Sequence, residues 1–224
     1  MLLRLEGVLA RDQLEGARAM LANVNFVDGK ASAGMAAARV KHNQEADRQA
    51  ADIRRLDNLV MDGLVRHPMY RAGALALKVA TPFYARYVPG MRYGDHVDDP
   101  VMGGADGLYR TDIAITIFLS EPEGYDGGEL VVHTAFGEQK IKLPAGDAVM
   151  YPASSLHRVA EVTRGERLVA VTWVQSLVRD PARRELLYEL NQVRERMLRE
   201  APDATETVKV NAVYVNLVRM WSEL

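Results

Sequence analysis

Residues 77–179 carry a regular series of short β-forming runs separated by turn residues, and this pattern limits the fold more strongly than any other feature. The runs are rich in Val, Ile, Thr and aromatic residues, which favour strands. Strands at such short, regular spacing are typical of an antiparallel sandwich or a jelly roll. The runs QKIKL and DAVMYP stand on either side of Pro144-Ala145-Gly146, so the sequence predicts a tight hairpin there.

The residues before this region have a helical pattern. Leu14 and Leu21 lie on one face of a predicted helix, with Asp12 as its N-cap. A second amphipathic helix is predicted over 53–64, and Pro68 is predicted to end it. Residues 1–76 are therefore predicted to form an N-terminal helical support region.

A second helical region follows Asp180-Pro181. An apolar stripe that includes Leu187 and Leu190 predicts one helix, and the segment from Thr205 to Leu224 predicts another. We therefore predict an α+β fold in three parts: N-terminal helices (1–76), an antiparallel β core (77–179) and a small helical C-terminal appendage (180–224).

The composition excludes several kinds of site. The chain has 224 residues and no cysteine, so disulfides, zinc ribbons, iron–sulfur clusters and thiol catalysis are excluded, and any metal site must use nitrogen and oxygen ligands. The formal net charge of -2 gives no reason to expect nucleic acid or an anionic membrane as a partner. No apolar run approaches the roughly 20 residues that span a bilayer, and the N-terminal run is charged too early for a secretory signal. We expect a cytoplasmic protein.

Four residues in the β region form a candidate site. His96 and Asp98 lie two residues apart near the end of one predicted strand, and His157 precedes the last long strand. In a jelly roll these places can meet at one mouth of the barrel, and two histidines with one carboxylate suit non-haem iron(II) with open positions. Arg167 opens the last strand and offers the planar donor pair that a carboxylate accepts.

Each candidate also has an ordinary structural interpretation, because His-x-Asp is a common pair: Asp98 could cap a loop, His157 could be a surface residue and Arg167 could form a surface ion pair. The remaining histidines are weaker candidates. His133, on a predicted strand, is the only rival ligand, whereas His42 and His67 fall in or beside helical segments and are expected at the surface. Tyr87 and Tyr93 flank the turn before His96 and line either the site or the core.

The stretch from FYARYVPGMRYGDHVDD through TIFLSEP and YDGGELVV to KLPAGDAVMYPASSLHRVAEVTRGERLVAVTWVQS resembles the iron- and 2-oxoglutarate-dependent dioxygenases of the prolyl-4-hydroxylase class. More narrowly, the chain resembles the bacterial PKHD-type hydroxylases, a group associated with iron uptake. The segments DGKASAG, VKHNQ and VRDPARRELLYEL extend this likeness to nearly the whole chain. The resemblance implies a double-stranded β-helix (jelly roll) for the core at 77–179.

The resemblance also implies roles for individual residues. His96, Asp98 and His157 match the three iron ligands, and Arg167 matches the basic residue that pairs with the distal carboxylate of 2-oxoglutarate, where many eukaryotic members have lysine. Tyr87 matches a tyrosine near the cosubstrate in some relatives, and His133 matches no functional position. The implied activity is hydroxylation of a small-molecule or peptide substrate by O2, coupled to decarboxylation of 2-oxoglutarate to succinate and CO2. The need for L-ascorbate stays open.

Several alternatives stay open as well. A cupin-like metal-binding oxygenase or a sensor protein would not use 2-oxoglutarate; Arg167 argues against the first and the complete ligand set against the second. The glycine-rich loop Asp99–Arg110 is either a substrate lid or an ordinary connection. The C-terminal helices either form a homo-oligomer or cover the barrel.

Overall fold

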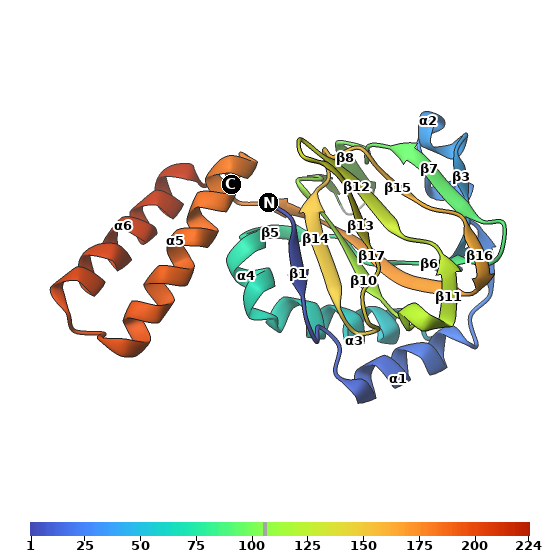
Figure 1. Cartoon of the computed structure of the whole chain (residues 1–224), viewed down its shortest axis with the longest axis horizontal. Helices are drawn as coiled ribbons and strands as arrows, with labels where there is room; N and C mark the ends of the chain where they lie inside the picture. The colour runs from blue at the N-terminus through green and yellow to red at the C-terminus, as the bar shows by residue number, and fades with distance from the viewer. Residues whose placement is uncertain (105–106) are drawn as a thin grey trace.

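The computed structural model describes residues 1–104 and 107–224. Two antiparallel sheets face each other in a jelly roll, helices cover the outer face of the larger sheet, and a helical hairpin stands to one side (Figure 1). The predicted α+β jelly roll with N-terminal helices and a helical C-terminal appendage is therefore confirmed. The exact boundaries at 76/77 and 179/180 stay predictions.

The larger sheet has eight strands among the described residues, and β17 lies at its centre. In spatial order the path is β1 (Leu3–Leu5), β14 (Ala148–Pro152), β10 (Ile113–Phe118), β17 (Arg167–Ser176), β6 (Phe83–Tyr87), β4 (Gln44–Ala46) and β2 (Phe26–Asp28), with β5 (Ala76–Val79) also paired to β17.

The smaller sheet carries both predicted histidine ligands. Its order is β13 (Gly137–Ile141), β12 (Leu130–Thr134), β15 (His157–Val159), β7 (Arg92–His96) and β3 (Lys41–His42). Two further antiparallel pairs are β11 (Tyr125–Gly127) with β16 (Val162–Gly165), and β8 (Val101–Gly104) with β9 (Gly107–Arg110). The predicted loop Asp99–Arg110 thus contains a β-ribbon; its residues 105 and 106 lie outside the described residues.

The central strands are apolar on both faces because both faces are covered. Along β10, Ile113, Ile115 and Ile117 pack against the helices, whereas Ala114 and Phe118 pack between the two sheets. The helices on the outer face are α1 (Arg11–Leu21), α3 (Ile53–Arg66) and α4 (Pro68–Ala74), and a short α2 (Met35–Ala38) lies near β7. The same alternation on β17 points its odd-numbered residues toward the smaller sheet, where the candidate site lies.

Three local predictions need correction. The predicted hairpin is wrong: β13 pairs with β12 in the smaller sheet, whereas β14 pairs with β1 and β10 in the larger one. The physical reason is burial, since β13 is an exposed edge strand and β14 is almost fully buried, so the turn between them crosses from one sheet to the other. Asp12 is not the N-cap of α1; the helix begins after Ala10, whose N–H donates to the Gln13 side chain at 3.0 Å.

The third correction concerns the N-terminal region, which adds strands β1 to β4 to both sheets besides its predicted helices. His42 accordingly lies in a strand rather than beside a helix. Pro68 does end the helix before it, because α3 stops at Arg66, and it also occupies the first turn of α4, where its missing N–H costs no hydrogen bond.

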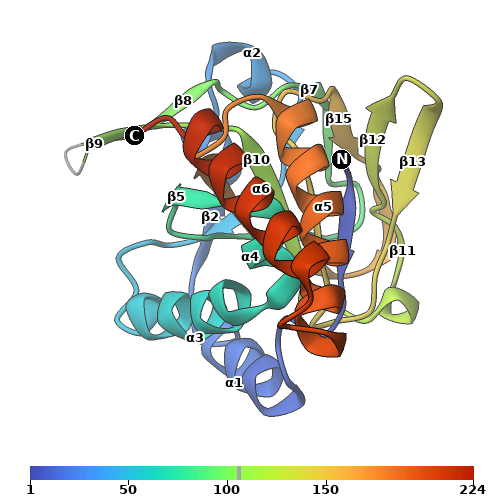
Figure 2. The ribbon, with the colours of Figure 1, turned by 90° about the vertical axis from the view of Figure 1, so that its left-hand side faces the viewer.

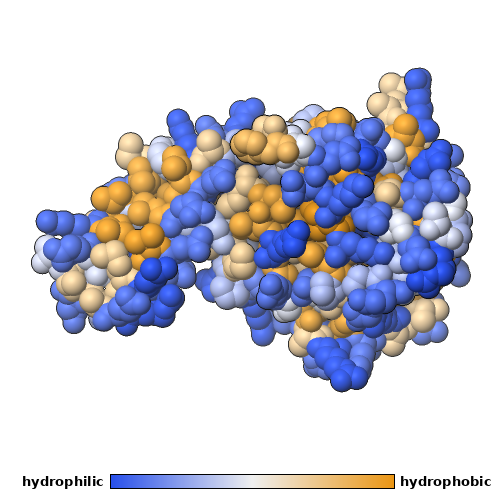
Figure 3. Space-filling view, in the orientation of Figure 1, coloured by the Kyte–Doolittle hydropathy of each residue, from blue (hydrophilic) through white to orange (hydrophobic). Residues whose placement is uncertain are grey.

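The C-terminal hairpin consists of α5 (Pro181–Glu200) and α6 (Thr205–Trp221), which lie side by side (Figure 2). Asp180 caps α5 by accepting from the N–H groups of Ala182 and Arg183. The hairpin carries exposed apolar side chains, and orange atoms gather on it in the hydropathy view (Figure 3). No helix in the described ranges 1–104 and 107–224 has the length and apolar character needed to cross a membrane.

Candidate metal and cosubstrate site

Strand register places the two histidines opposite each other. β7 and β15 are antiparallel neighbours, and His96 at the end of β7 is paired directly with His157 at the start of β15. Directly opposed residues in an antiparallel pair hold their side chains close together on the same face. The pairing of two short strands therefore joins histidines that are 61 positions apart in the chain.

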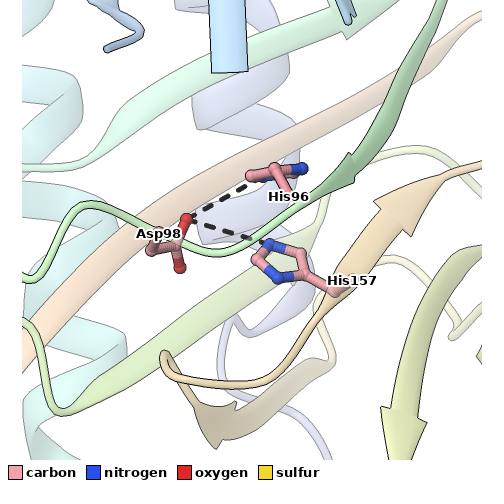
Figure 4. Close-up of side chains that lie close together, drawn as sticks. All are labelled: His96, Asp98 and His157. Carbon is pink, nitrogen blue, oxygen red and sulfur yellow. Dashed lines mark ion pairs between the residues drawn. The ribbon is translucent and has the colours of Figure 1, made fainter. Parts of the chain in front are cut away.

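Asp98 completes a group of three on the segment that follows β7. Its Oδ1 atom lies 3.9 Å from Nε2 of His96 and 3.8 Å from Nε2 of His157 (Figure 4). The three donor atoms all lie within 4.8 Å of one another, and the three side chains are 6–8% exposed. This spacing leaves room at the centre for one metal ion held on a single face.

The ring orientations leave the correct nitrogen free for a metal. Nδ1 of His96 lies 2.8 Å from the carbonyl oxygen of Gly94, and Nδ1 of His157 lies 3.0 Å from that of Ser155. A carbonyl oxygen can only accept, so each Nδ1 carries a proton and each Nε2 is the ring nitrogen directed toward Asp98. Burial, with a smaller contribution from the charge of His157, lowers the pKa of His96 to about 4, so the ring is neutral at pH 7.

The carboxylate is held from the opposite sheet. Trp173 on β17 donates its Nε1–H to Oδ2 of Asp98 at 2.9 Å, which leaves Oδ1 toward the histidines. Burial raises the pKa of Asp98, while the charge of His157 and the Trp173 hydrogen bond oppose that shift. A divalent cation at the centre would favour the carboxylate further, because an adjacent positive charge stabilises the ionised form.

Arg167 lies at the beginning of β17, on the same inward face as Trp173, and is only 1% exposed. Among the described residues, its Nε has no hydrogen-bond partner and no acidic side chain lies within 4 Å of its guanidinium. Gly128, with φ at +66°, makes room for it, because a Cβ there would lie 3.0 Å from Cδ of Arg167. A buried guanidinium without an anion is costly, so the geometry fits an anionic ligand.

Tyr87 is the cross-strand partner of Arg167 on β6. The guanidinium carbon of Arg167 lies 5.1 Å from the centre of the Tyr87 ring, and the ring itself is 3% exposed. Burial raises the pKa of Tyr87 to about 12, although the charge of Arg167 opposes this, so the phenol stays protonated near neutral pH. Tyr87 therefore offers a neutral hydroxyl and a ring face to whatever binds beside Arg167.

One cavity of about 110 Å³ joins these residues, and we call it the main cavity. All five predicted site residues line it: His96, Asp98, His157, Arg167 and Tyr87. Tyr93 lines it too and stacks on His96 with ring centres 3.6 Å apart. A single ligand in this space can therefore contact both the histidine–aspartate group and the arginine.

Other side chains of the main cavity were not predicted from the sequence. Trp173 could have been found from its spacing, because it lies six positions after Arg167 and so on the same strand face. Lys41 and Glu45 form a buried ion pair of 2.6 Å at the wall, and Ser32 donates to the same carboxylate. These three come from the N-terminal region, whose pairing with the barrel had not been predicted.

The other histidines lie outside the main cavity. Nε2 of His133 lies 3.3 Å from a carboxylate oxygen of Asp95 and 2.9 Å from Arg158 in a partly exposed cluster. His42 faces the carbonyl oxygen of Gly90, and His67 that of Glu6. Within the described part of the chain, the only group of three or more side chains with metal-ligand spacing is His96, Asp98 and His157.

Fold and site together define a 2-oxoglutarate–iron(II) oxygenase. Residues 82–175 match the 2OG-Fe(II) oxygenase superfamily, and residues 181–223 match the PKHD-type hydroxylase C-terminal domain. The chain is 55% identical over 224 residues to a PKHD-type hydroxylase of Thioalkalivibrio sulfidiphilus, with 100% of both chains covered. It therefore belongs to the PKHD-type hydroxylase family.

Solved structures agree with this fold. A prolyl-4-hydroxylase of Pseudomonas putida is 20% identical with a TM-score of 0.52, covering 78% of this chain and 92% of that one. A prolyl hydroxylase of Trichoplax adhaerens, in complex with a peptide of hypoxia inducible factor, is 15% identical with a TM-score of 0.56, covering 78% and 83%. The protein is an oxygenase of the hydroxylase type whose cofactor and cosubstrate are iron(II) and 2-oxoglutarate.

Proposed function

We propose that His96, Asp98 and His157 hold the iron(II) ion and that Arg167, beside Tyr87, binds the distal carboxylate of 2-oxoglutarate. The observation that carries this proposal is the buried guanidinium of Arg167, which has no acidic side chain within 4 Å among the described residues and lies in the same cavity as the three metal-ligand side chains. A dicarboxylic acid that reaches both groups satisfies each of them, because one end chelates a metal and the other accepts from a guanidinium.

The reaction we propose is hydroxylation of a substrate coupled to decarboxylation of 2-oxoglutarate to succinate and CO2. When bound, the iron supplies the oxidative chemistry with O2. The chain contributes geometry: the Gly94 and Ser155 carbonyls fix the histidine rings, and Trp173 fixes the carboxylate. The three ligand side chains are only 6–8% exposed, so little of their surface is in contact with bulk water.

Succinate formation tests this proposal. We expect the iron-loaded protein to convert 2-oxoglutarate to succinate slowly when no other substrate is present, and to stop when oxygen is removed. The alternative, a cupin-like oxygenase or a sensor, predicts no succinate with or without oxygen. The same assay with and without L-ascorbate decides whether ascorbate supports turnover.

We propose that the substrate that receives the oxygen is a small molecule or a peptide. The resemblance to the PKHD group also suggests that the reaction has a role in iron uptake. The peptide bound by the Trichoplax relative supports the peptide reading. Screening peptides and iron-chelating small molecules for faster succinate formation separates the two classes. A cytoplasmic location stays a prediction.

We also propose that the β8–β9 ribbon acts as a lid. Met102 on β8 lines the main cavity, while Val101 and Leu108 are exposed at 53% and 65%. An exposed apolar ribbon beside a cavity can close over a bound ligand. Limited proteolysis of the nickel-loaded protein with and without 2-oxoglutarate and a stimulating substrate tests this, and identical cleavage in the ribbon would count against a lid.

The C-terminal hairpin is the proposed route to a homo-oligomer. Exposed apolar side chains on both helices support this, among them Leu186, Val193 and Val208 at 62%, 51% and 59% exposure. Burial of such side chains against a second copy would stabilise a dimer. Sedimentation of the Val193→Glu, Val208→Glu double variant tests the idea, and an assembly state unchanged from the parent would remove it.

A further inference from the structure

A second cavity, which we call the side cavity, lies against the metal end of the main cavity. Its volume is about 270 Å³, and Val97 and Asp98 line both cavities. The remaining walls come from three parts of the chain: residues around Arg110 at the end of the β8–β9 ribbon, Ala153 and Ser154 after β14, and the segment from Arg179 to Arg184 that leads into α5. The side cavity therefore lies where the oxygenase core meets the C-terminal hairpin.

Three arginines line the side cavity, and they differ in whether a carboxylate lies close enough to form an ion pair with them. Arg110 is paired, because its Nε and Nη2 donate to the two oxygens of Asp112 at 2.7 and 3.0 Å. Asp112 uses its Oδ2 also to accept from the N–H of Ser176. Arg179 and Arg184 have no acidic side chain within 4 Å among the described residues. Among the described residues, two of the three guanidinium groups thus have no carboxylate within ion-pair distance, and the charges of Asp112 and Asp180 act on Arg184 only from farther away.

Arg184 is the most informative of the three because it is buried. Its residue exposure is 4%, and its Nη1 donates to the carbonyl oxygens of Val178 and Arg179 at 2.7 and 2.8 Å. These bonds hold the end of β17 to α5, which is a structural role, but carbonyl oxygens do not neutralise a charge. A buried cation is strongly favoured only when an anion compensates it.

We propose that the side cavity binds an anionic oxygen group of the substrate, a carboxylate or a phosphate, through Arg184 and Arg179. This inference rests on the proposed function, since it takes the substrate to enter beside the iron ligands. Asp98 lies in the wall shared by both cavities, so a substrate anchored by its anion at Arg184 extends toward the metal. The C-terminal hairpin then determines substrate specificity, and neutral substrates lack this anchor.

Anion binding can be measured without knowing the substrate. The probe is trifluoroacetate, followed by fluorine NMR relaxation on protein saturated with 2-oxoglutarate, so that Arg167 is already occupied. Samples loaded with diamagnetic zinc(II) and with paramagnetic cobalt(II) are compared, because only a probe near the metal relaxes faster with cobalt. Trifluoroethanol serves as the neutral control.

We expect trifluoroacetate to bind, to relax faster in the cobalt sample and to be displaced by salt, whereas trifluoroethanol shows none of these effects. Arg184→Gln should weaken binding about tenfold or more, because it removes a buried charged partner. Arg179→Gln should weaken it about threefold, since Arg179 is exposed. Arg196→Gln, an exposed arginine elsewhere on α5, is the matched control and should leave binding unchanged.

Arg184→Gln can also loosen the junction between β17 and α5, so Arg184→Lys, which keeps the charge, is measured beside it together with the melting temperature of each variant. If Arg184→Gln unfolds the protein, Arg179→Gln and the salt dependence decide the question. Inorganic phosphate and acetate are then compared as competitors of the probe, and the stronger one identifies the preferred group.

If trifluoroacetate binds equally well to Arg179→Gln, Arg184→Gln and the parent, the side cavity is not an anion site. Equal fluorine relaxation of trifluoroacetate in the zinc and cobalt samples would also overturn the proposal. Failure of the proposed function is a separate result, because 2-oxoglutarate binding is measured on the same samples and succinate formation on the iron-loaded form of each variant. A protein that turns over 2-oxoglutarate but ignores trifluoroacetate loses only the substrate inference.

Discussion

The two ends of the main cavity differ in how far the protein has already satisfied its own polar groups. At the metal end, the three ligand side chains are oriented by hydrogen bonds to Gly94, Ser155 and Trp173. At the arginine end, Arg167 is buried, and its Nε has no hydrogen-bond partner in the part of the chain that the structure describes. The first end is a preorganised set of donors, and the second carries a charge that a ligand must complete. Substitution of a metal ligand should therefore abolish activity, whereas substitutions at the arginine end should reduce affinity by degrees.

The largest effect is expected for Asp98→Ala. The change removes a metal ligand and its negative charge, so we expect loss of stoichiometric iron binding and of succinate formation. Metal content after dialysis and succinate by chromatography are the measurements. Asp95→Ala is the control, because Asp95 lies three positions earlier, on β7, but pairs with His133 and Arg158 at the surface. Full activity in Asp98→Ala would place the metal site elsewhere.

Arg167→Ala is expected to weaken 2-oxoglutarate binding while iron binding is retained. Loss of a buried charged partner typically costs about 2–5 kcal/mol, which is tens to thousands of fold in affinity. Calorimetric titration of the metal-loaded protein measures it. Arg86→Ala is the control, since Arg86 lies beside Tyr87 in sequence but contacts Gln44 and Phe26 outside the cavity. A parent-like affinity in Arg167→Ala would remove its assigned role.

Trp173→Phe tests whether orientation at the metal end matters beyond the ligands themselves. Loss of its hydrogen bond to Asp98 should lower iron affinity about 10–100-fold, with the aromatic packing largely kept. Competition with a chelator of known affinity gives the value. Trp221→Phe, on the C-terminal hairpin, should have no effect on iron. Similar iron affinities in both variants would mean that the hydrogen bond from Trp173 to Asp98 does not contribute to iron binding.

Tyr87→Phe should have the smallest effect. A neutral hydroxyl contributes about 0.5–1.5 kcal/mol, so we expect a rise of roughly 2–12-fold in the dissociation constant of 2-oxoglutarate. Tyr84→Phe, on the same strand, is the matched control. Tyr84 donates instead to Asp57 at 3.0 Å, on the helix-covered face, so its loss should lower stability and leave 2-oxoglutarate affinity unchanged. An equal loss of affinity in both variants would point to a general effect on the fold.

The sequence predicted the metal end better than the walls around it. Longer strands such as β10 and β17 have an apolar pattern long enough to be recognised in the sequence. The roles of His96, Asp98, His157 and Arg167 were predicted from the resemblance to the family. Strands of two or three residues, such as β3 and β15, have no periodicity to detect, because partners distant in the chain define them. The contribution of Lys41 was missed for this reason. The sheet change between β13 and β14 was missed for another reason: a short turn between two strands does not show whether they pair with each other or belong to different sheets.

The central claim is that one dicarboxylate spans both ends of the main cavity, and a comparison of two ligands in two proteins tests it most directly. The ligands are 2-oxoglutarate and 2-oxopentanoate, which has a methyl group in place of the distal carboxylate, and both are titrated into the metal-loaded parent and Arg167→Ala. Such a cycle isolates the contact between the carboxylate and Arg167. We predict that the parent prefers 2-oxoglutarate by tens of fold or more and that Arg167→Ala loses this preference. An undiminished preference in Arg167→Ala would contradict the account.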